Sequence, residues 1–80
     1  MKKKILIVGS TGKLGTKLLN YLNKNSISVY CITCYKNLSK LSHQKKLYDI
    51  KNSFVLSDTN DQIKFFQFLK KNIQIIYFLD

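Results

Sequence analysis

The chain has 80 residues, of which 45% are hydrophobic and 22% are charged. This is the balance of one small soluble domain, and it excludes collagen-like, fibrous and strongly disordered classes. Lys and Arg together number 14 against 4 acidic residues, which gives a net charge of +10, and all 14 basic residues are Lys. Because the Lys are scattered and Arg is absent, we expect a solvated basic surface and no nucleic-acid partner.

Two Cys are too few for a disulfide scaffold. The apolar run of residues 5–8 is shorter than the core of a signal peptide, and no stretch reaches the length of a membrane span. We therefore expect a cytoplasmic protein with no membrane partner.

The first half of the chain predicts a strand, a helix, a second strand and a second helix. Residues 4–8 begin with Lys4 and continue as an apolar run rich in β-branched side chains up to Gly9, as in a strand buried on both faces. From Lys13 to near Asn25 the period becomes helical, and residues 28–34 predict another buried strand. The apolar stripe of the first helix is Leu14, Leu18, Tyr21 and Leu22, and that of the second is Leu38, Leu41, Leu47 and Tyr48.

The second half continues the alternation. Residues 53–57 predict a third strand, and Thr59 with Gln62 forms a capping box for a third helix. The stripe of this helix is Ile63, Phe66 and Leu69, beside Phe65 and Phe68. Residues 73–78 predict a fourth strand.

The order βαβαβαβ predicts the α/β class, as a partial Rossmann-like doubly wound parallel sheet. The chain ends directly after a strand, so we expect residues 1–80 to be the N-terminal part of a larger domain that is incomplete at its C-terminus.

All three Gly stand in one strand-to-helix turn, Gly9-Ser10-Thr11-Gly12-Lys13-Leu14-Gly15. In this context the GxxGxxG pattern indicates a dinucleotide-binding loop, with Gly12 leaving room for a pyrophosphate and Gly15 letting the helix pack closely. The N-terminus of the helix offers N–H groups to the phosphates. A Walker A loop is excluded because its sequence pattern is absent.

The end of the second strand indicates which dinucleotide binds. An NAD site needs an acidic residue there for the ribose, but the first acidic residue of the chain is Asp49, within the predicted second helix. Lys36 and Asn37 stand at this end instead and suit the 2′-phosphate of NADPH. The plainer alternatives are a solvated Lys36 and an Asn37 that only caps the second helix.

Other polar and aromatic residues favour ordinary structural roles. Cys31 and Cys34 point to opposite faces of a strand, so we expect them in the core and not at a shared metal or disulfide. We expect His43 on the surface, and we expect Asp58 to act with Thr59 in capping the third helix, although it could approach an adenine edge. The aromatic cluster of residues 65–68 is interpreted as core.

With these residues in view, the segment from Lys2 to Thr16 and the pair Lys36-Asn37 resemble the 1-deoxy-D-xylulose 5-phosphate reductoisomerase family, whose signature is GSTGSIG followed by AGKN. The resemblance implies that NADPH phosphates contact Thr11, Gly12, Lys13 and Leu14, with Lys36 and Asn37 at the adenosine end. Lys13 stands where the family has Ser, and Tyr35 stands where it has Gly.

The same resemblance implies an isomerisation and NADPH-dependent reduction to 2-C-methyl-D-erythritol 4-phosphate, for isoprenoid precursors. The full-length enzyme uses a sugar-phosphate substrate and a divalent metal, Mg or Mn, and a homodimer is an option for it. The family's metal-binding carboxylates lie beyond position 80, so we expect the 80-residue chain to carry no catalytic residue and no metal site. The alternatives are a fragment of an extended short-chain dehydrogenase or NmrA-like NADP-binding protein, and a binding-only module such as a redox sensor or nucleic-acid binder.

Overall fold

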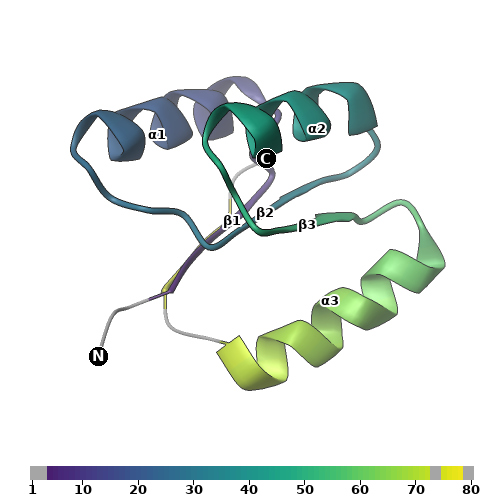
Figure 1. Cartoon of the computed structure of the whole chain (residues 1–80). Helices are drawn as coiled ribbons and strands as arrows, with labels where there is room; N and C mark the ends of the chain where they lie inside the picture. The colour runs from purple at the N-terminus through teal and green to yellow at the C-terminus, as the bar shows by residue number, and fades with distance from the viewer. Residues whose placement is uncertain (1–3, 73–74, 79–80) are drawn as a thin grey trace.

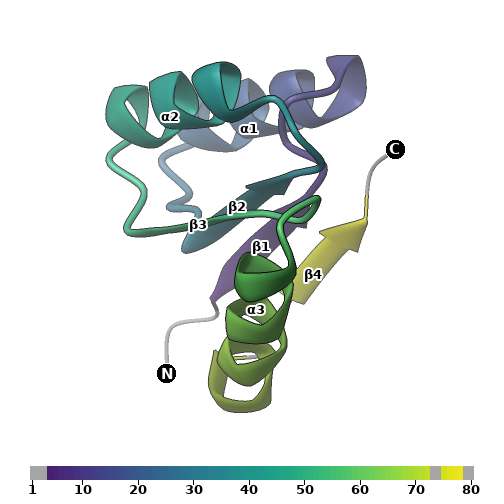
Figure 2. The same cartoon turned by 90° about the vertical axis from the view of Figure 1, so that its right-hand side faces the viewer.

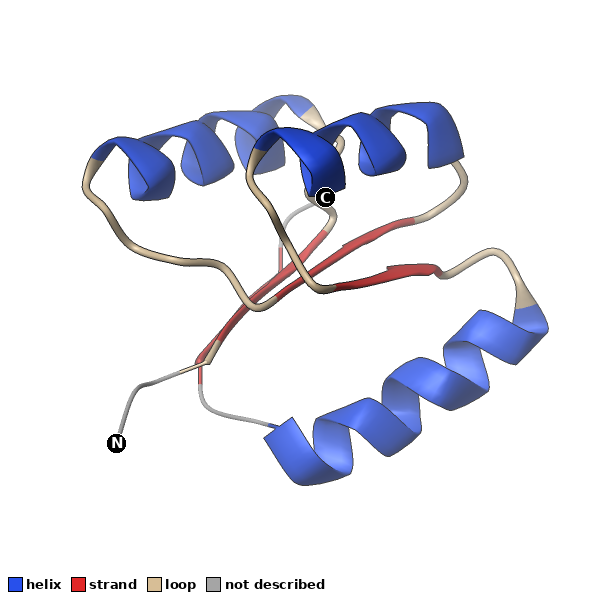
Figure 3. Ribbon diagram, viewed as in Figure 1, coloured by secondary structure: helices blue, strands red, loops and turns tan. Residues whose placement is uncertain are grey.

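The computed structural model describes residues 4–72 and 75–78. Strands and helices alternate as predicted (Figure 3). The second and third strands are shorter than predicted, and residues 73 and 74 of the predicted fourth strand lie outside the described residues. The second strand begins only at Cys31, and the third ends at Val55. In chain order the elements are β1 (Ile5–Val8), α1 (Lys13–Lys24), β2 (Cys31–Cys34), α2 (Leu38–Leu47), β3 (Asn52–Val55), α3 (Thr59–Asn72) and β4 (Ile75–Phe78).

The four strands form one parallel sheet in the order β3-β2-β1-β4. Leu6 in the middle of β1 pairs with Cys31 of β2 on one side and with Ile76 of β4 on the other. Helices α1 and α2 cover one face of this sheet and α3 covers the other (Figures 1 and 2). The Rossmann-like doubly wound prediction is therefore confirmed, and the carboxyl ends of all four strands meet at one edge.

The sheet divides the apolar core into two layers. The layer beneath α1 and α2 contains Ile5, Ile7, Leu19, Leu22, Ile32, Cys34, Leu41 and Ile50. The layer above α3 contains Leu6, Cys31 and Phe65, with Val8, Phe54, Leu56, Phe68 and Leu69 packed against them. Cys31 and Cys34 are free thiols buried in different layers, so the prediction that they occupy opposite faces is confirmed.

The predicted stripe of α1 is confirmed at Leu18 and Leu22 and wrong at Leu14 and Tyr21. The buried residues of this helix are Gly15, Leu19 and Leu22, whereas Leu14 is 59% exposed and Tyr21 is 63% exposed. Leucines at 14, 18, 19 and 22 allow two overlapping stripes. Close packing of Gly15 on the preceding loop selects the second of them.

The stripe of α2 also differs from the prediction. Leu41 is buried, but Leu38 and Leu47 are exposed, and the other buried residue of this helix is the polar Gln44. The helix ends earlier than the position of Asp49, which follows it in the left-handed region with φ 52°. Asp49 is thus in a turn and not within the helix.

The start of α3 differs in its cap. The carboxylate of Asp58 accepts from the N–H of Asp61 at 3.0 Å, while the side chain of Gln62 donates to the carbonyl of Leu56 at 2.6 Å. Asp58 therefore caps α3, which confirms its expected capping role. The predicted capping box of Thr59 with Gln62 is wrong, because the Gln62 side chain bonds Leu56 instead. The charged side chain of Asp58 replaces Thr59 in this role because it directly precedes the first helical turn.

The core face of α3 is aromatic, as expected, but turned from the predicted stripe. Phe65 is buried and Phe68 is half-buried, and both rings contact that of Phe54 at centroid distances of 5.4 and 5.5 Å. Ile63 and Phe66 are exposed. Phe54 lies on β3 and faces α3. Its ring contacts favour the side of the helix that carries Phe65 and Phe68, so this side is turned toward the sheet.

Candidate functional site

The glycine-rich loop turns back onto the end of β2. Gly9 has a φ of 94°, a conformation that L side chains rarely adopt. This turn lets the N–H groups of both Gly9 and Ser10 donate to the carbonyl of Thr33, at 3.1 and 2.9 Å. The first two amides of the loop are therefore occupied within the protein.

The helix α1 begins in close contact with this loop. A Cβ on Gly15 would collide with the carbonyl oxygen of Gly9 and would lie 2.7 Å from the Cα of Ser10. Glycine at this position thus lets the helix approach the loop backbone, as the sequence predicted for close packing.

The next amides are available to a ligand. Within residues 4–72 and 75–78, the N–H groups of Thr11, Gly12, Lys13 and Leu14 have no hydrogen-bond acceptor, and no side chain caps the first turn of α1. Four free donors at a helix N-terminus favour a negatively charged group, because the helix dipole adds to their partial positive charge.

A buried polar cluster supports the loop from behind. The side chain of Gln44 accepts from the hydroxyl of Ser10 at 2.8 Å and donates to the carbonyl of Ser10, also at 2.8 Å. The hydroxyl of Thr16 donates to the same carbonyl at 3.3 Å. Sequence reasoning missed this cluster, although Gln44 lies three residues after Leu41 and so shares its buried helix face.

An open depression of about 380 Å³ lies where β1, β2 and β3 end. In open parallel sheets, ligands bind in the crevice outside the carboxyl ends of the strands. The lining residues are Val8, Gly9, Thr11, Gly12, Thr33, Cys34, Tyr35 and Leu56.

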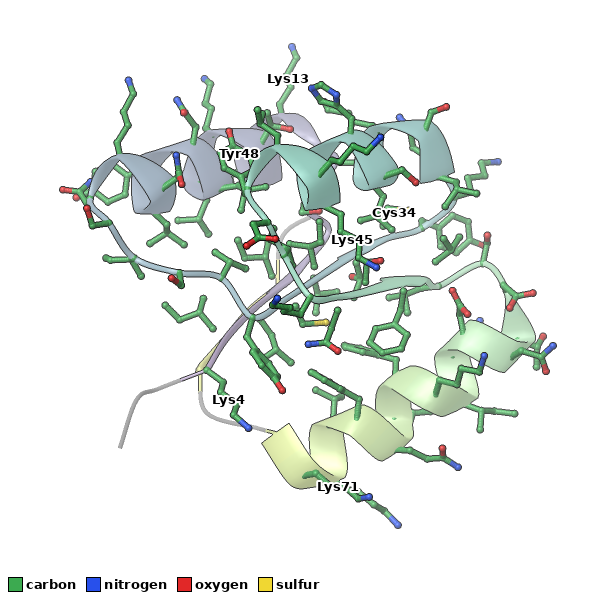
Figure 4. The ribbon with its side chains drawn as sticks, viewed as in Figure 1. Lys4, Lys13, Cys34, Lys45, Tyr48 and Lys71 are labelled. Atoms are coloured by element: carbon green, nitrogen blue, oxygen red, sulfur yellow. The ribbon has the colours of Figure 1, made fainter. Side chains whose placement is uncertain are left out.

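The structure brings only part of the predicted residue set to this depression. Thr11 and Gly12 line it, whereas the side chains of Lys13 and Leu14 are exposed, and that of Lys13 points away from the sheet (Figure 4). Any contact of these two residues with a phosphate would therefore come from their backbone N–H groups. Tyr35, 69% exposed on the rim, was not among the predicted binding residues.

The pair after β2 lies next to the depression. Lys36 is exposed beside Tyr35, and its carbonyl accepts from the N–H of Leu38 at 2.9 Å. The side chain of Asn37 accepts from the N–H of Lys40 at 3.2 Å and so caps α2. One oxygen of Asn37 serves the helix, while its amide nitrogen remains a donor.

The carboxylates near the third strand have structural partners. Asp61 accepts from the N–H of Val55 at 2.8 Å, and Asp58 caps α3. Among the described residues, no three His, Cys, Asp or Glu side chains gather as metal ligands. His43 is exposed, as expected. In the same part of the chain, no helix has both the length and the apolar composition to cross a bilayer.

Comparison with known proteins adds a family and a set of relatives. The model of the NAD dependent epimerase/dehydratase family matches residues 5–79. Curated proteins named 1-deoxy-D-xylulose 5-phosphate reductoisomerase are also similar to the chain. The one from Pelagibacter ubique is 40% identical over 55 residues, which cover 66% of this chain and 14% of the relative.

Two further relatives with the same name extend this similarity. The Agathobacter rectalis protein is 39% identical over 64 residues, covering 78% of this chain and 16% of its own length. The Thermoanaerobacter sp. protein is 32% identical over 77 residues, covering 92% of this chain and 20% of its own. The chain thus spans a fifth or less of these relatives' lengths, and the resemblance inferred from the glycine loop is confirmed.

Proposed function

The chain belongs to the NAD dependent epimerase/dehydratase family, and from this we propose that residues 1–80 are the N-terminal part of an NADPH-binding domain. The pyrophosphate binds the free N–H groups of Thr11, Gly12, Lys13 and Leu14, and the adenosine end lies toward Lys36 and Asn37. The observation that carries this proposal is the division of the loop amides. Gly9 and Ser10 donate within the protein, while the next four amides have no acceptor in the described residues beside the depression.

The residues present fit this dinucleotide. The depression is open along the ends of three strands, and no acidic side chain lines it. Lys36 and Asn37 are exposed and directly follow the lining residue Tyr35, and their side chains suit a 2′-phosphate better than a bare ribose hydroxyl. When bound, NADPH supplies a hydride, and the residues of this chain hold and orient its phosphates.

We propose further that this chain is part of a longer protein with the activity of its relatives. Its similarity to reductoisomerases supports a reaction on 1-deoxy-D-xylulose 5-phosphate, a sugar phosphate, with Mg or Mn and further residues outside this chain. Asp58 and Asp61 are engaged by backbone N–H groups, which supports the view that the isolated chain is inactive. The two free, buried Cys support a reducing, cytoplasmic location.

Titration of NADPH against the chain and its Gly12→Val variant tests the binding site. Gly12 has φ −72° and ψ 174°, an extended conformation open to any residue, so valine adds bulk without backbone strain. We expect NADPH affinity to fall by at least roughly tenfold, while the unfolding temperature stays close to that of the parent. An affinity within about twofold of the parent would show that the loop is only a turn.

A second candidate is an NADP-binding protein of the epimerase/dehydratase kind that does not act on 1-deoxy-D-xylulose 5-phosphate. The family match over residues 5–79 favours it specifically. Sequencing the DNA downstream of the Asp80 codon separates the two. A continuing frame with an acidic metal-binding motif supports the reductoisomerase, and a continuing frame without one supports the second candidate.

A further inference from the structure

We propose that Gln44 is a positioning residue for dinucleotide binding, because it sets the orientation of the peptide between Ser10 and Thr11. This inference rests on the proposed function and assigns a role to a residue of α2 that lies behind the loop. Gln44 is 4% exposed and Ser10 is fully buried, so the two side chains meet away from water.

The amide of Gln44 holds Ser10 at two atoms. Its oxygen accepts from the Ser10 hydroxyl and its nitrogen donates to the Ser10 carbonyl, both at 2.8 Å. The nitrogen also lies 3.4 Å from the hydroxyl of Thr16, which itself donates to the Ser10 carbonyl. One side chain of α2 thus links the loop to the first turn of α1.

Peptide geometry carries this contact to the binding side of the loop. The chain has no cis peptide among its described residues, and in a planar trans peptide the C=O and the following N–H point in opposite directions. Since the Ser10 carbonyl is held toward Gln44, the N–H of Thr11 is held away from α2. Thr11 is also the first loop amide without an acceptor in the described chain, and it lines the depression.

Loss of the Gln44 amide would free this peptide to rotate. The Thr11 N–H would then no longer be pre-oriented toward a phosphate, and binding would have to order it. The effect should be confined to ligands that carry a pyrophosphate, because the side-chain hydrogen bonds of Gln44 go to Ser10 and Thr16 and not to Lys36 or Asn37.

The test compares two probes on the 80-residue chain by calorimetric titration. NADPH engages the loop, whereas adenosine 2′-monophosphate carries the 2′-phosphate but no pyrophosphate. For Gln44→Met we expect NADPH binding to weaken at least about tenfold and adenosine 2′-monophosphate binding to change less than about twofold. Gln44→Asn, whose amide is one methylene too short to reach Ser10, should show the same selective loss.

Leu41→Val is the matched control. Leu41 lies on the same buried face of α2, is 1% exposed and makes no hydrogen bond to the loop. This variant should lower the unfolding temperature and leave the ratio of the two affinities unchanged. Equal weakening of both probes in the Gln44 variants, or no weakening of NADPH, would overturn the positioning role.

A measurement without ligand adds a second readout. Gln44 anchors Ser10, whose N–H donates to the Thr33 carbonyl, so amide hydrogen exchange at Ser10 should accelerate in Gln44→Met, while exchange at Leu6 in the central strand stays unchanged. Unaltered exchange at Ser10 would contradict the inference. Failure of the unaltered chain to bind either probe would instead overturn the proposed function, and the inference with it.

Discussion

The carbonyl oxygen of Gly9 occupies the space that a Cβ on Gly15 would need. The two residues lie on either side of the turn from β1 into α1, and their contact sets how closely the helix approaches the loop. A change at Gly15 therefore alters the loop as well as the helix.

Gly15→Ala should destabilise the chain. Alanine is favoured over glycine within a helix by about 1 kcal/mol. Here its Cβ meets backbone atoms of Gly9 and Ser10, including the Ser10 carbonyl carbon at 2.9 Å, and backbone cannot rotate away. We expect the overpacking to prevail, with a net loss of about 2 kcal/mol in the free energy of unfolding, measured by urea denaturation. Asn20→Ala, on the exposed side of α1, should be neutral or stabilising, and an equally stable Gly15→Ala chain would contradict this prediction.

Lys36→Ala should reduce the preference for NADPH over NADH. A charge-assisted contact with the 2′-phosphate is available only with NADPH, and its loss should weaken that ligand roughly 10–150-fold. NADH binding should be nearly unchanged, as measured by fluorescence titration of both dinucleotides.

The control for this prediction is Lys46→Ala. Lys46 is exposed near the end of α2, whereas Lys40, one turn after Lys36, is half-buried and so less suitable. An equal loss for both dinucleotides in Lys36→Ala would mean that Lys36 acts on stability or on the shared phosphates.

Substitutions at Asn37 should separate its two roles. Asn37→Asp keeps an oxygen that can accept from the N–H of Lys40, so the cap and the stability should be retained. The same change replaces the amide donor with a negative charge, so NADPH should bind more weakly. Asn37→Ala should instead lose about 1 kcal/mol of stability with the cap. Thermal unfolding and NADPH titration of both variants measure the two roles separately. Unchanged NADPH affinity in Asn37→Asp would show that Asn37 is a helix cap and does not bind the cofactor.

Cys31 should make stability fall at high pH. Burial raises the pKa of its thiol from 9.0 to about 12. Above pH 9 the unfolded chain releases this proton while the folded chain retains it, so the free energy of unfolding decreases as pH rises toward 12. The slope for one such group is about 1.4 kcal/mol per pH unit.

Comparison with Cys31→Ala isolates this contribution, because titration of the Lys side chains is common to both chains. The difference in urea-unfolding free energy between parent and variant should shrink with rising pH above about 9. A difference that is constant up to pH 11 or so would show that the thiol does not titrate differently in the two states.

The sequence was sufficient for the order of elements and for the position of the glycine-rich loop between β1 and α1. The signals used for this are local. Each β-branched run, each helical period and the glycine-rich turn can be recognised within a short stretch of sequence. The phase of each helix was less predictable, since it depends on which neighbour the helix meets. Leu14 and Leu19 are equally apolar, and only contact between Gly15 and the loop decides which of them is buried.

Gln44 shows a second limit of sequence reasoning. Among Lys and His neighbours it looks like a solvated polar residue, and its partner Ser10 is 34 residues away in the chain. Its burial depends on a pair of hydrogen bonds that exists only once α2 has packed over the loop. Tyr35, which lines the depression, was noted only as a departure from the family's Gly and not as a binding residue, because exposure beside a depression has no periodic signal.

The position of β1 in the sheet has a consequence for biosynthesis. β1 pairs with β2 on one edge and with β4 on the other, so residue 5 meets residue 75. A ribosome makes this central strand first, and one of its edges has no partner until the stretch 75–78 has left the exit tunnel. The half-sheet of β1, β2 and β3 can form before residues 75–78 are made, whereas pairing at the other edge of β1 has to wait for them. Contacts of such long range slow folding, and through that interval β1 exposes a strand edge able to pair with other nascent chains.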